Sequence, residues 1–379
     1  MKYCKNCLEP TTFKIQTFDS QGICFTCKYF SKFVENFDES ERLKILKDIC
    51  LKYKNKDQAF DCIIGVSGGK DSTRQALWIK EKLKMRPLLV CCTYPPDQLT
   101  EVGAKNLSNL IKLGFDLLVT APSPQTWKKI LKKGFYDGNY LRGPELALYS
   151  SLPQIAIKYK IKLIFWGEGG NGKTTDSRII IKEREFDGNL LRKNNTLKNC
   201  DLTWMSDIID DQAKLIPYKY PSEKEFLING IQIIYLGWFI KDWSILNNAK
   251  YASLYGLSLR PDNAERTGDL YGSMALDEDW VIVNQMIKYY KYGFGRARDY
   301  LNYEIRQGKI SRENATKLVE KYDGKCDQKY IKSFCKFIEI SENEFWEVVS
   351  NFVNKELFTL NNKKNSEKYL PKFKVGTGI

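Results

Sequence analysis

The sequence predicts an α/β protein with a parallel, doubly wound, Rossmann-like sheet, an N-terminal four-cysteine knuckle and a C-terminal helical subdomain. Short apolar runs alternate with helical patterns through the middle of the chain, which is typical of a parallel sheet. Two C-x2-C pairs precede that region, and helix signals prevail after residue 277. We therefore expect a knuckle at residues 1–38, an α/β domain at 39–243, a helical subdomain at 244–360 and a polar, mobile tail at 361–379.

The first element is a predicted metal site formed by Cys4, Cys7, Cys24 and Cys27, with sixteen residues between the two pairs. Four thiolates complete the tetrahedral shell of a structural zinc ion and leave no position open for catalysis. The segment is too short to bury a core of its own, so we expect the metal to fold it and dock it on the next domain. Four unrelated buried cysteines or an iron–sulfur cluster are the alternatives.

A helix is predicted next, at residues 39–56. Leu43, Leu46, Ile49 and Cys50 lie on one of its faces at helical spacing. This amphipathic helix is expected to connect the knuckle to the sheet.

The stretch DCIIGVSGGKDS, residues 61–72, predicts a buried strand, a glycine loop and the start of a helix. Gly68 and Gly69 break the strand, and apolar residues at helical spacing follow Ser72. Such a loop directs unpaired backbone N–H groups outward at the positive end of a helix, and glycine lets an anion approach them closely. The stretch therefore predicts a phosphate-binding site, with a solvated glycine turn as the alternative.

Further strands and helices alternate along the chain. Strands are predicted at residues 87–93, 115–120, 161–166 and 231–236, and helices at residues 99–113, 126–133 and 151–160. Ligands of parallel sheets bind at the carboxyl ends of the strands. We therefore expect residues 93–95, a loop at residues 142–145, and Gly167 with Glu168 to surround the same cleft as the glycine loop.

The remainder of the chain is predicted to form an irregular insertion, a last strand and then a helical C-terminal third. Residues 176–215 are charged and weakly periodic, which predicts an irregular insertion that serves as a lid or is a solvated excursion. Ser311 and Ser341 are expected to cap two of the helices that follow.

Composition limits the chemistry and the partners. Histidine is absent, which excludes a histidine base, a histidine relay and histidine metal ligands. The eleven cysteines favour metal or catalytic use over disulfides. Despite a net charge of +14, no Lys/Arg block stands out, so nucleic-acid binding is not expected. Because no apolar run reaches the roughly 18 residues of a membrane span and no signal-peptide pattern opens the chain, we expect a cytoplasmic protein without membrane contact.

A second glycine-rich stretch competes for the role of nucleotide site. Residues 167–174, GEGGNGKT, match the Walker A pattern and follow an apolar strand. A Walker A loop should open a long helix, whereas Ile179, Ile180 and Ile181 form a β-branched run here, and no apolar strand ending in aspartate follows. We therefore rank this interpretation second.

The string SGGKDS resembles the PP-loop of the ATP pyrophosphatases, which split ATP between the α and β phosphates. The resemblance implies that residues 39–243 bind ATP, that Asp71 holds Mg²⁺ and that Lys70 takes part in catalysis. The residues that would bind ATP and its departing pyrophosphate are Ser67, Gly68, Gly69, Lys70, Asp71, Ser72, Thr93 and Gly167.

Over nearly its whole length the chain resembles the N-acetyl sugar amidotransferases, which make acetamidino sugars for flagellin and lipopolysaccharide. The resemblance rests on the two C-x2-C pairs, SGGKDS, the Gly-Glu after the fourth strand, and residues 290–324, YKYGFGRARDYLNYEIRQGKISRENATKLVEKYDG. The glycines at 293, 295 and 308 are costly within a helical pattern, which suggests close approach of neighbouring chain segments.

This resemblance implies a definite reaction. ATP would adenylylate the oxygen of an N-acetyl amide, pyrophosphate would leave, and ammonia would attack the activated carbon to give an acetamidine and AMP. The glycine loop, Mg²⁺ and lysines can assist this chemistry without histidine. Because a chain without histidine cannot carry the glutaminase machinery of class I, we expect a separate glutaminase subunit to supply ammonia.

The family's sugars are acidic, either a nonulosonic acid of the pseudaminic acid type or a diacetamido uronic acid, and a carboxylate needs a basic partner. The candidate substrate-binding residues are Lys173, Arg178, Arg184, Lys291 and Arg296. Glu168 would complete the Mg²⁺ site or orient ammonia.

Two other functions remain open. A tRNA thiolase would also combine a metal knuckle with a PP-loop, and Cys91 or Cys92 at the end of the second strand could carry sulfur. Core packing is the plainer interpretation of these two thiols. A non-catalytic scaffold that binds metal and nucleotide would bind ATP without releasing pyrophosphate.

Overall fold

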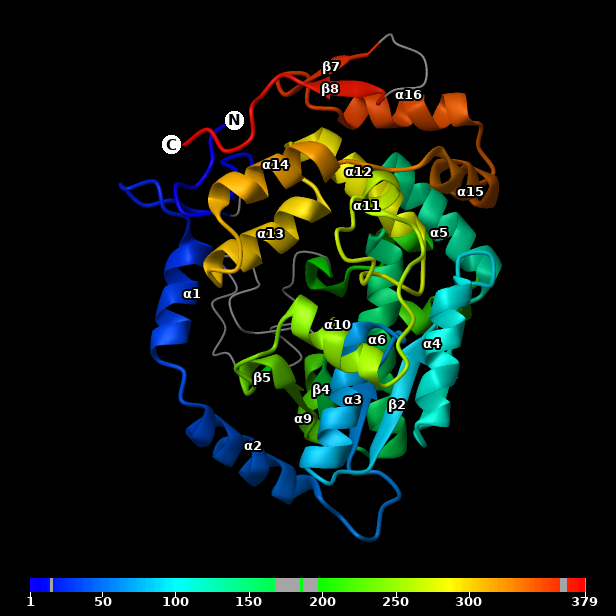
Figure 1. The fold of residues 1–379 in the computed structure, drawn as a ribbon. Coiled ribbons are helices and arrows are strands. Elements are labelled where there is room, and N and C mark those ends of the chain that lie inside the picture. Colours follow the sequence, from blue (N-terminus) through cyan, green and yellow to red (C-terminus); the bar gives the residue numbers. More distant parts are fainter. Residues whose placement is uncertain (14–15, 168–184, 187–196, 362–366, 379) are drawn as a thin grey trace.

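One sheet organises the fold, which we describe from a computed structural model covering residues 1–13, 16–167, 185–186, 197–361 and 367–378 (Figure 1). The strand order is β3-β2-β1-β4-β6-β5. The strands are β1 (Cys62–Gly65), β2 (Pro87–Cys92), β3 (Asp116–Thr120), β4 (Leu163–Trp166), β5 (Glu185–Phe186) and β6 (Gln232–Tyr235). The short β5 pairs antiparallel with β6, and the other pairs are parallel. The predicted parallel α/β sheet is confirmed.

Two hydrophobic cores cover the two faces of this sheet. Ile63 and Val90 belong to one core, whereas Ile64, Leu89 and Phe165 belong to the other. Successive strand residues point to opposite faces, so the continuous apolar runs arise because both faces are covered. Helices α5 (Pro124–Tyr136), α6 (Arg142–Tyr159) and α9 (Glu223–Asn229) contribute to the first core, and α2 (Glu39–Tyr53), α3 (Lys70–Lys82), α4 (Glu101–Lys112) and α10 (Ile245–Leu254) to the second.

Helix α6 corrects one prediction. Residues 142–145 were expected to form a loop, but α6 begins at Arg142 and continues through Pro153 to Tyr159. Proline is tolerated in the first turn of a helix, where its missing N–H has no partner to lose. Leu146, Leu152 and Ala156 are buried against the sheet, and this packing outweighs the helix-breaking signals of the sequence.

The described part of the predicted irregular insertion contains β5 and several short helical elements. The helical elements are η1 (Lys198–Cys200), α8 (Thr203–Ser206) and η2 (Gln212–Tyr218), and η3 (Leu236–Trp238) follows β6. Leu197, Met205, Ile209 and Leu215 are buried in the first core. The described part is therefore packed on the body of the protein.

Helices dominate the C-terminal region, as predicted. They are α11 (Ala264–Thr267), α12 (Trp280–Tyr292), α13 (Arg296–Arg306), α14 (Arg312–Tyr322), α15 (Gln328–Ile338) and α16 (Glu342–Phe352). Both predicted caps are confirmed, because Ser311 Oγ accepts a hydrogen bond from Asn314 N and Ser341 Oγ accepts one from Glu344 N. The Phe135 ring stacks on Phe345 with centroids 5.2 Å apart, so these helices share the first core with the sheet.

The glycines of the C-terminal region have two different roles. A Cβ atom on Gly295 would lie 3.1 Å from Asp323 Oδ1 and 3.1 Å from Gly324 N, which confirms the expected close approach there. Gly308 has open space around it, but its φ of +70° is a conformation that favours glycine.

The two ends of the described chain lie together, with helix α1 (Phe25–Glu35) after the cysteine knuckle (Figure 1). The segment predicted as a polar, mobile tail contains β8 (Tyr369–Pro371), which pairs with β7 (Phe358–Leu360). Tyr3 N donates to Thr377 O at 2.8 Å, and Val375 is buried beside Tyr3. The polar composition does not predict this ordered packing, because the tail is held by backbone hydrogen bonds rather than by an apolar pattern.

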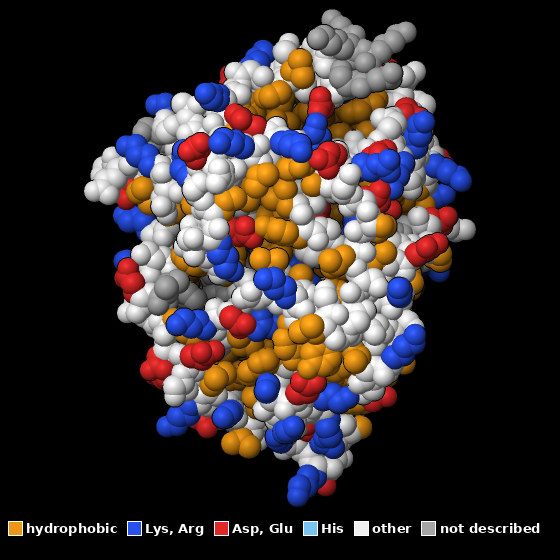
Figure 2. All heavy atoms as spheres, in the orientation of Figure 1, with side chains coloured by type: hydrophobic (Ala, Val, Ile, Leu, Met, Phe, Trp, Pro, Cys, Tyr) orange, Lys and Arg blue, Asp and Glu red, His pale blue; other side chains and the backbone are white. Residues whose placement is uncertain are grey.

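Surface charge is mixed. On the face shown in Figure 2, Lys and Arg side chains alternate with Asp and Glu side chains. Within the described residues, no helix is both long and apolar enough to cross a membrane.

Candidate nucleotide site and cysteine cluster

The glycine loop joins β1 to α3 at the carboxyl ends of the parallel strands. Gly68 has a φ of +75°, and a Cβ atom there would lie 3.1 Å from Leu107 N of α4. Only glycine fits this position without strain. Helix α3 begins at Lys70, two residues earlier than predicted, and no described side chain caps its N-terminus. Its first backbone N–H groups can therefore serve an anion.

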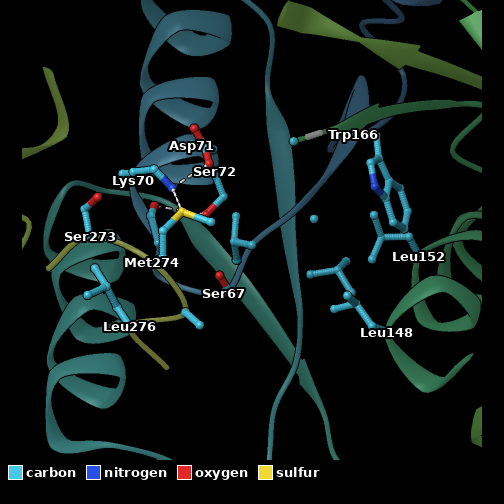
Figure 3. Close-up of a pocket in the computed structure, with 16 residues that line it drawn as sticks. Ser67, Lys70, Asp71, Ser72, Leu148, Leu152, Trp166, Ser273, Met274 and Leu276 are labelled. Carbon is cyan, nitrogen blue, oxygen red and sulfur yellow. Dashed lines mark hydrogen bonds and ion pairs between the residues drawn. The ribbon is translucent and has the colours of Figure 1, made fainter. Parts of the chain in front are cut away.

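A cavity of about 220 Å³ lies beside this loop, at the carboxyl ends of the neighbouring strands β1 and β4, at the switch point where the strand order reverses (Figure 3). One part of its wall is polar and consists of Ser67, Gly69, Lys70, Asp71, Ser72 and Ser273. Another part is apolar and consists of Val90, Leu148, Leu152 and Trp166. A wall of this kind suits a ligand with a charged end and a flat or apolar end.

Lys70 and Asp71 form the charged centre of the cavity. The Lys70 ammonium lies 2.9 Å from Asp71 Oδ2, and the side chain of Lys70 is 4% exposed. Asp71 is more open, with 30% of its side chain exposed. One carboxylate beside a phosphate site fits Mg²⁺, which is commonly held by one or two carboxylates together with substrate phosphates.

Helix α10 orients this carboxylate, which the sequence did not predict. Asn248 of α10 is fully buried and donates from Nδ2 to Asp71 Oδ1. Its Oδ1 accepts a hydrogen bond from Arg74 Nη1 at 2.7 Å, and Arg74 Nη2 donates to Asp242 Oδ1 at 2.6 Å. A single Asn far along the chain has no distinguishing pattern. The position of Arg74, three residues after Asp71 on the same helix, was the available signal.

The C-terminal region supplies another wall of the cavity. Residues 273–276 line it, and Met274 Sδ lies 2.7 Å from Lys70 Nζ. The Asp269 carboxylate holds this segment by accepting hydrogen bonds from Tyr271 N and Met274 N, each at 3.1 Å. No local motif marks these residues, so only the folded chain identifies them.

Some of the residues predicted for the nucleotide site line the cavity, and others lie away from it or outside the described residues. Ser67, Gly69, Lys70, Asp71, Ser72 and Gly167 line the cavity, and Gly68 shapes the loop. Thr93 lies one residue after β2, where its N–H pairs with Thr120 O, and it does not line this cavity. Glu168, Lys173, Arg178, Arg184 and the rest of the Walker A stretch after Gly167 lie outside the described residues.

Two predicted sugar-binding cations lie elsewhere. Lys291 Nζ donates to Gly138 O at 2.9 Å and lies over the Phe352 ring, between α12 and the turn after α5. Arg296 begins α13, close to Asp299 and Tyr300. Neither residue lines the cavity.

The four N-terminal cysteines form a compact cluster that fits a metal ion. Their Sγ atoms lie within 4.8 Å of one another, and Cys7 Sγ is 3.7 Å from Cys24 Sγ. Tetrahedral zinc with Zn–S bonds of about 2.3 Å requires sulfur atoms roughly 3.8 Å apart. Backbone N–H groups of Cys24 and Cys27 donate to cluster sulfurs, as expected for thiolates. The cluster can therefore bind a metal.

Helix α13 supplies the charge that balances this cluster. Arg306 Nε lies 3.5 Å from Cys27 Sγ and Arg306 Nη2 lies 3.6 Å from Cys7 Sγ. Next to it, Arg298 Nη1 donates to Glu9 Oε1 at 2.8 Å, and both side chains are nearly inaccessible. The knuckle is therefore docked on the C-terminal region through buried charges, not on the α/β domain alone.

A buried acid beyond the cavity wall gives a pH-dependent prediction. Burial, and then the neighbouring Asp277 carboxylate, raises the pKa of Glu278 to about 7. The folded-state pKa exceeds the unfolded value of 4.5, so stability should fall as the pH rises from about 4.5 through about 7. In E278Q the amide oxygen can still accept hydrogen bonds from Val281 N and Gln98 Nε2. We expect E278Q to be more stable than wild type at pH 8, by on the order of 1–3 kcal/mol, and to lose this advantage at pH 5.

Urea unfolding at pH 5, 6, 7 and 8 would measure this difference. A gap between E278Q and wild type that stays constant across the four values would show that Glu278 does not titrate in this range.

Two comparisons by sequence match parts of this chain. The family described as "LPS biosynthesis protein WbpG-like, C-terminal domain" matches residues 265–371. An uncharacterized protein of Methanocaldococcus jannaschii is 33% identical over 88 residues, which are 23% of this chain and 31% of that relative. The chain thus spans about a third of the length of that relative.

Similar solved structures include the U34-tRNA thiolase NcsA from Methanococcus maripaludis with its 4Fe-4S cluster. It has 13% identity, covers 89% of this chain and 96% of its own, and has a TM-score of 0.28. The NMN synthetase from Francisella tularensis has 14% identity, covers 63% and 99%, and has a TM-score of 0.26.

Proposed function

We propose, from the premise that this chain carries the WbpG-like C-terminal domain of a lipopolysaccharide biosynthesis protein, that it is an ATP-dependent amidotransferase acting on an N-acetylated sugar. The matched region includes residues 290–324, which confirms the family resemblance drawn from that segment. The observation that supports the proposal best is the cavity at the switch point. Its wall joins the glycine loop to residues 273–276 of the WbpG-like region.

The proposed reaction divides the work between the two parts of the wall. The N-terminus of α3, Lys70 and Ser72 would bind the departing pyrophosphate, and Asp71 would hold Mg²⁺. Once the amide oxygen of the sugar carries AMP, it becomes a good leaving group, and ammonia can replace it to give an acetamidine. Because the chain contains no histidine, ammonia is proposed to come from a separate glutaminase subunit.

Product analysis tests the proposal. The protein is incubated with ATP, Mg²⁺, ammonium and a panel of acidic acetamido sugars, and mass spectrometry follows the replacement of oxygen by NH. We expect AMP, pyrophosphate and an acetamidino sugar of the pseudaminic acid or diacetamido uronic acid type. ADP and phosphate would favour the Walker A stretch, and sulfur gain on tRNA with no sugar product would favour a thiolase.

The two thiols at the end of β2 give no support to a thiolase. Cys92 is 8% exposed, and burial raises its pKa to about 12, so it is a neutral thiol near pH 7. Burial also raises the pKa of Cys91. We expect Cys92→Ser to keep wild-type turnover of the sugar, measured as AMP release. A loss of turnover without loss of thermal stability would point to a reactive thiol.

A further inference from the structure

Ser273 and Met274 are neighbours in the sequence, and both line the cavity. Ser273 is 1% exposed, and its hydroxyl has no hydrogen-bond partner among the described residues. A buried hydroxyl without a partner is costly, and in a native protein it calls for an explanation such as a ligand. Figure 3 shows Ser273 and Met274 on the same side of the cavity as Lys70.

One of the two described contacts of Lys70 is unusual for a lysine, because it is a thioether. Its ammonium has three donors, and the described contacts are Asp71 Oδ2 at 2.9 Å and the Met274 thioether at 2.7 Å. A thioether is a weak acceptor, whereas a phosphate oxygen is a strong, charged one. Lys70 is 3% exposed although it lines the cavity. The lysine is therefore covered, and one of its two described contacts is with a weak acceptor.

We propose that Met274 is a plug over the phosphate site, and that the departing phosphates of the nucleotide displace its side chain and bind Lys70 and Ser273 beneath it. This inference rests on the proposed function, because it assigns two ligands and a closed state to the same site. It also gives the WbpG-like region a part in nucleotide binding, since both plug residues belong to residues 265–371.

The backbone around the plug is fixed, so displacement needs only a side-chain rotation. Met274 N donates to Asp269 Oδ2 at 3.1 Å, and Arg260 Nη2 donates to Ala275 O at 2.6 Å. Arg260 N donates to Gly272 O at 2.8 Å. Methionine is unbranched and flexible, and Met274 is partly exposed, so its side chain can leave without opening the core.

Amine labelling of the nucleotide-free full chain tests the plug directly. We expect an acylating reagent to leave Lys70 unmodified in wild type and in M274L, which keeps the bulk, and to modify it in M274A. Magnesium pyrophosphate should bind M274A about fivefold more tightly than wild type, because the closed state no longer competes. Unchanged labelling and unchanged affinity in M274A would overturn the plug.

The Ser273 ligand is tested by binding of the same probe, magnesium pyrophosphate. We expect S273A to bind it about fivefold more weakly, with thermal stability unchanged or higher, because the hydroxyl has no partner in the free chain. The matched control is S150A, in which a buried hydroxyl that donates to Tyr218 O is lost. S150A should be less stable and bind the probe normally. Equal affinity in wild type and S273A would contradict the assignment.

These results separate the inference from the proposed function. The labelling needs no nucleotide. Unchanged labelling in M274A would therefore contradict the plug proposal even if the enzyme forms AMP. If instead the variants behave as expected with pyrophosphate while no sugar is converted, the plug stands and the amidotransferase proposal fails.

Discussion

Replacing Asp71 with asparagine is expected to lower AMP and pyrophosphate formation by on the order of 100-fold or more. Among the described residues that line the cavity, Asp71 supplies the one carboxylate, and the substitution removes its charge. Without it, Mg²⁺ would lose a protein ligand, and the charge on the departing pyrophosphate would be neutralised less well. The asparagine side chain keeps the size of the original and can pair with Asn248, so the fold should be unaffected.

Initial rates with saturating ATP would measure this effect, with excess Mg²⁺ added to test for partial rescue. The matched control is Asp116→Asn. Asp116 is exposed at the amino end of β3, whereas the glycine loop lies at the carboxyl ends of the strands. It should keep the wild-type rate. An Asp71→Asn protein with a near-normal rate would mean that the metal is held elsewhere, and the proposed site would be wrong.

Replacing Cys27 with serine is expected to cause the largest loss of stability. Cys27 is one of the four clustered thiols, and Arg306 Nε lies 3.5 Å from its sulfur. Loss of a ligand should release the metal and remove one of the two sulfur atoms beside the Arg306 charge, which is 3% exposed. Breaking a buried charge pair costs about 3–5 kcal/mol, so a loss of about that size or more is expected.

Metal analysis and thermal unfolding would test this together. Wild type should contain one zinc ion per chain by mass spectrometry, and Cys27→Ser should contain none. Cys326→Ser is the control, because Cys326 is partly exposed and outside the cluster. Hydrogen exchange should increase in both the knuckle and α13, because the two are docked through Arg306 and Arg298. Exchange confined to the knuckle would mean that α13 does not depend on the metal.

The local elements of this fold could be read from residue patterns. The β1 run is apolar at every position because both faces of the sheet are covered, and the glycine loop directly follows it. Ser311 and Ser341 marked helix starts through their own hydroxyl groups. The cysteine spacing placed four ligands together. Each of these signals depends on neighbours in sequence, so a linear reading was sufficient.

The failures have the opposite origin. Residues 142–145 were read as a loop because Gly143 and Pro144 disfavour a helix interior, but α6 is held by its buried face. The polar composition of the tail predicts mobility, because no residue pattern in it indicates backbone pairing. In the folded chain, the Tyr3 N–H donates to the Thr377 carbonyl. Lys291 and Arg296 do not line the cavity, and their part in sugar binding stays a prediction.

By itself the sequence determined the strand, glycine loop and helix beside the cavity, the grouping of four cysteines that can bind a metal, and the WbpG-like resemblance of the C-terminal segment. The tertiary structure alone decided that Asn248 orients Asp71, that Met274 covers Lys70 and that Arg306 balances the cysteine cluster. The physical reason is that these contacts join residues more than 170 positions apart. Their chemistry depends on distance and burial, which no local pattern encodes.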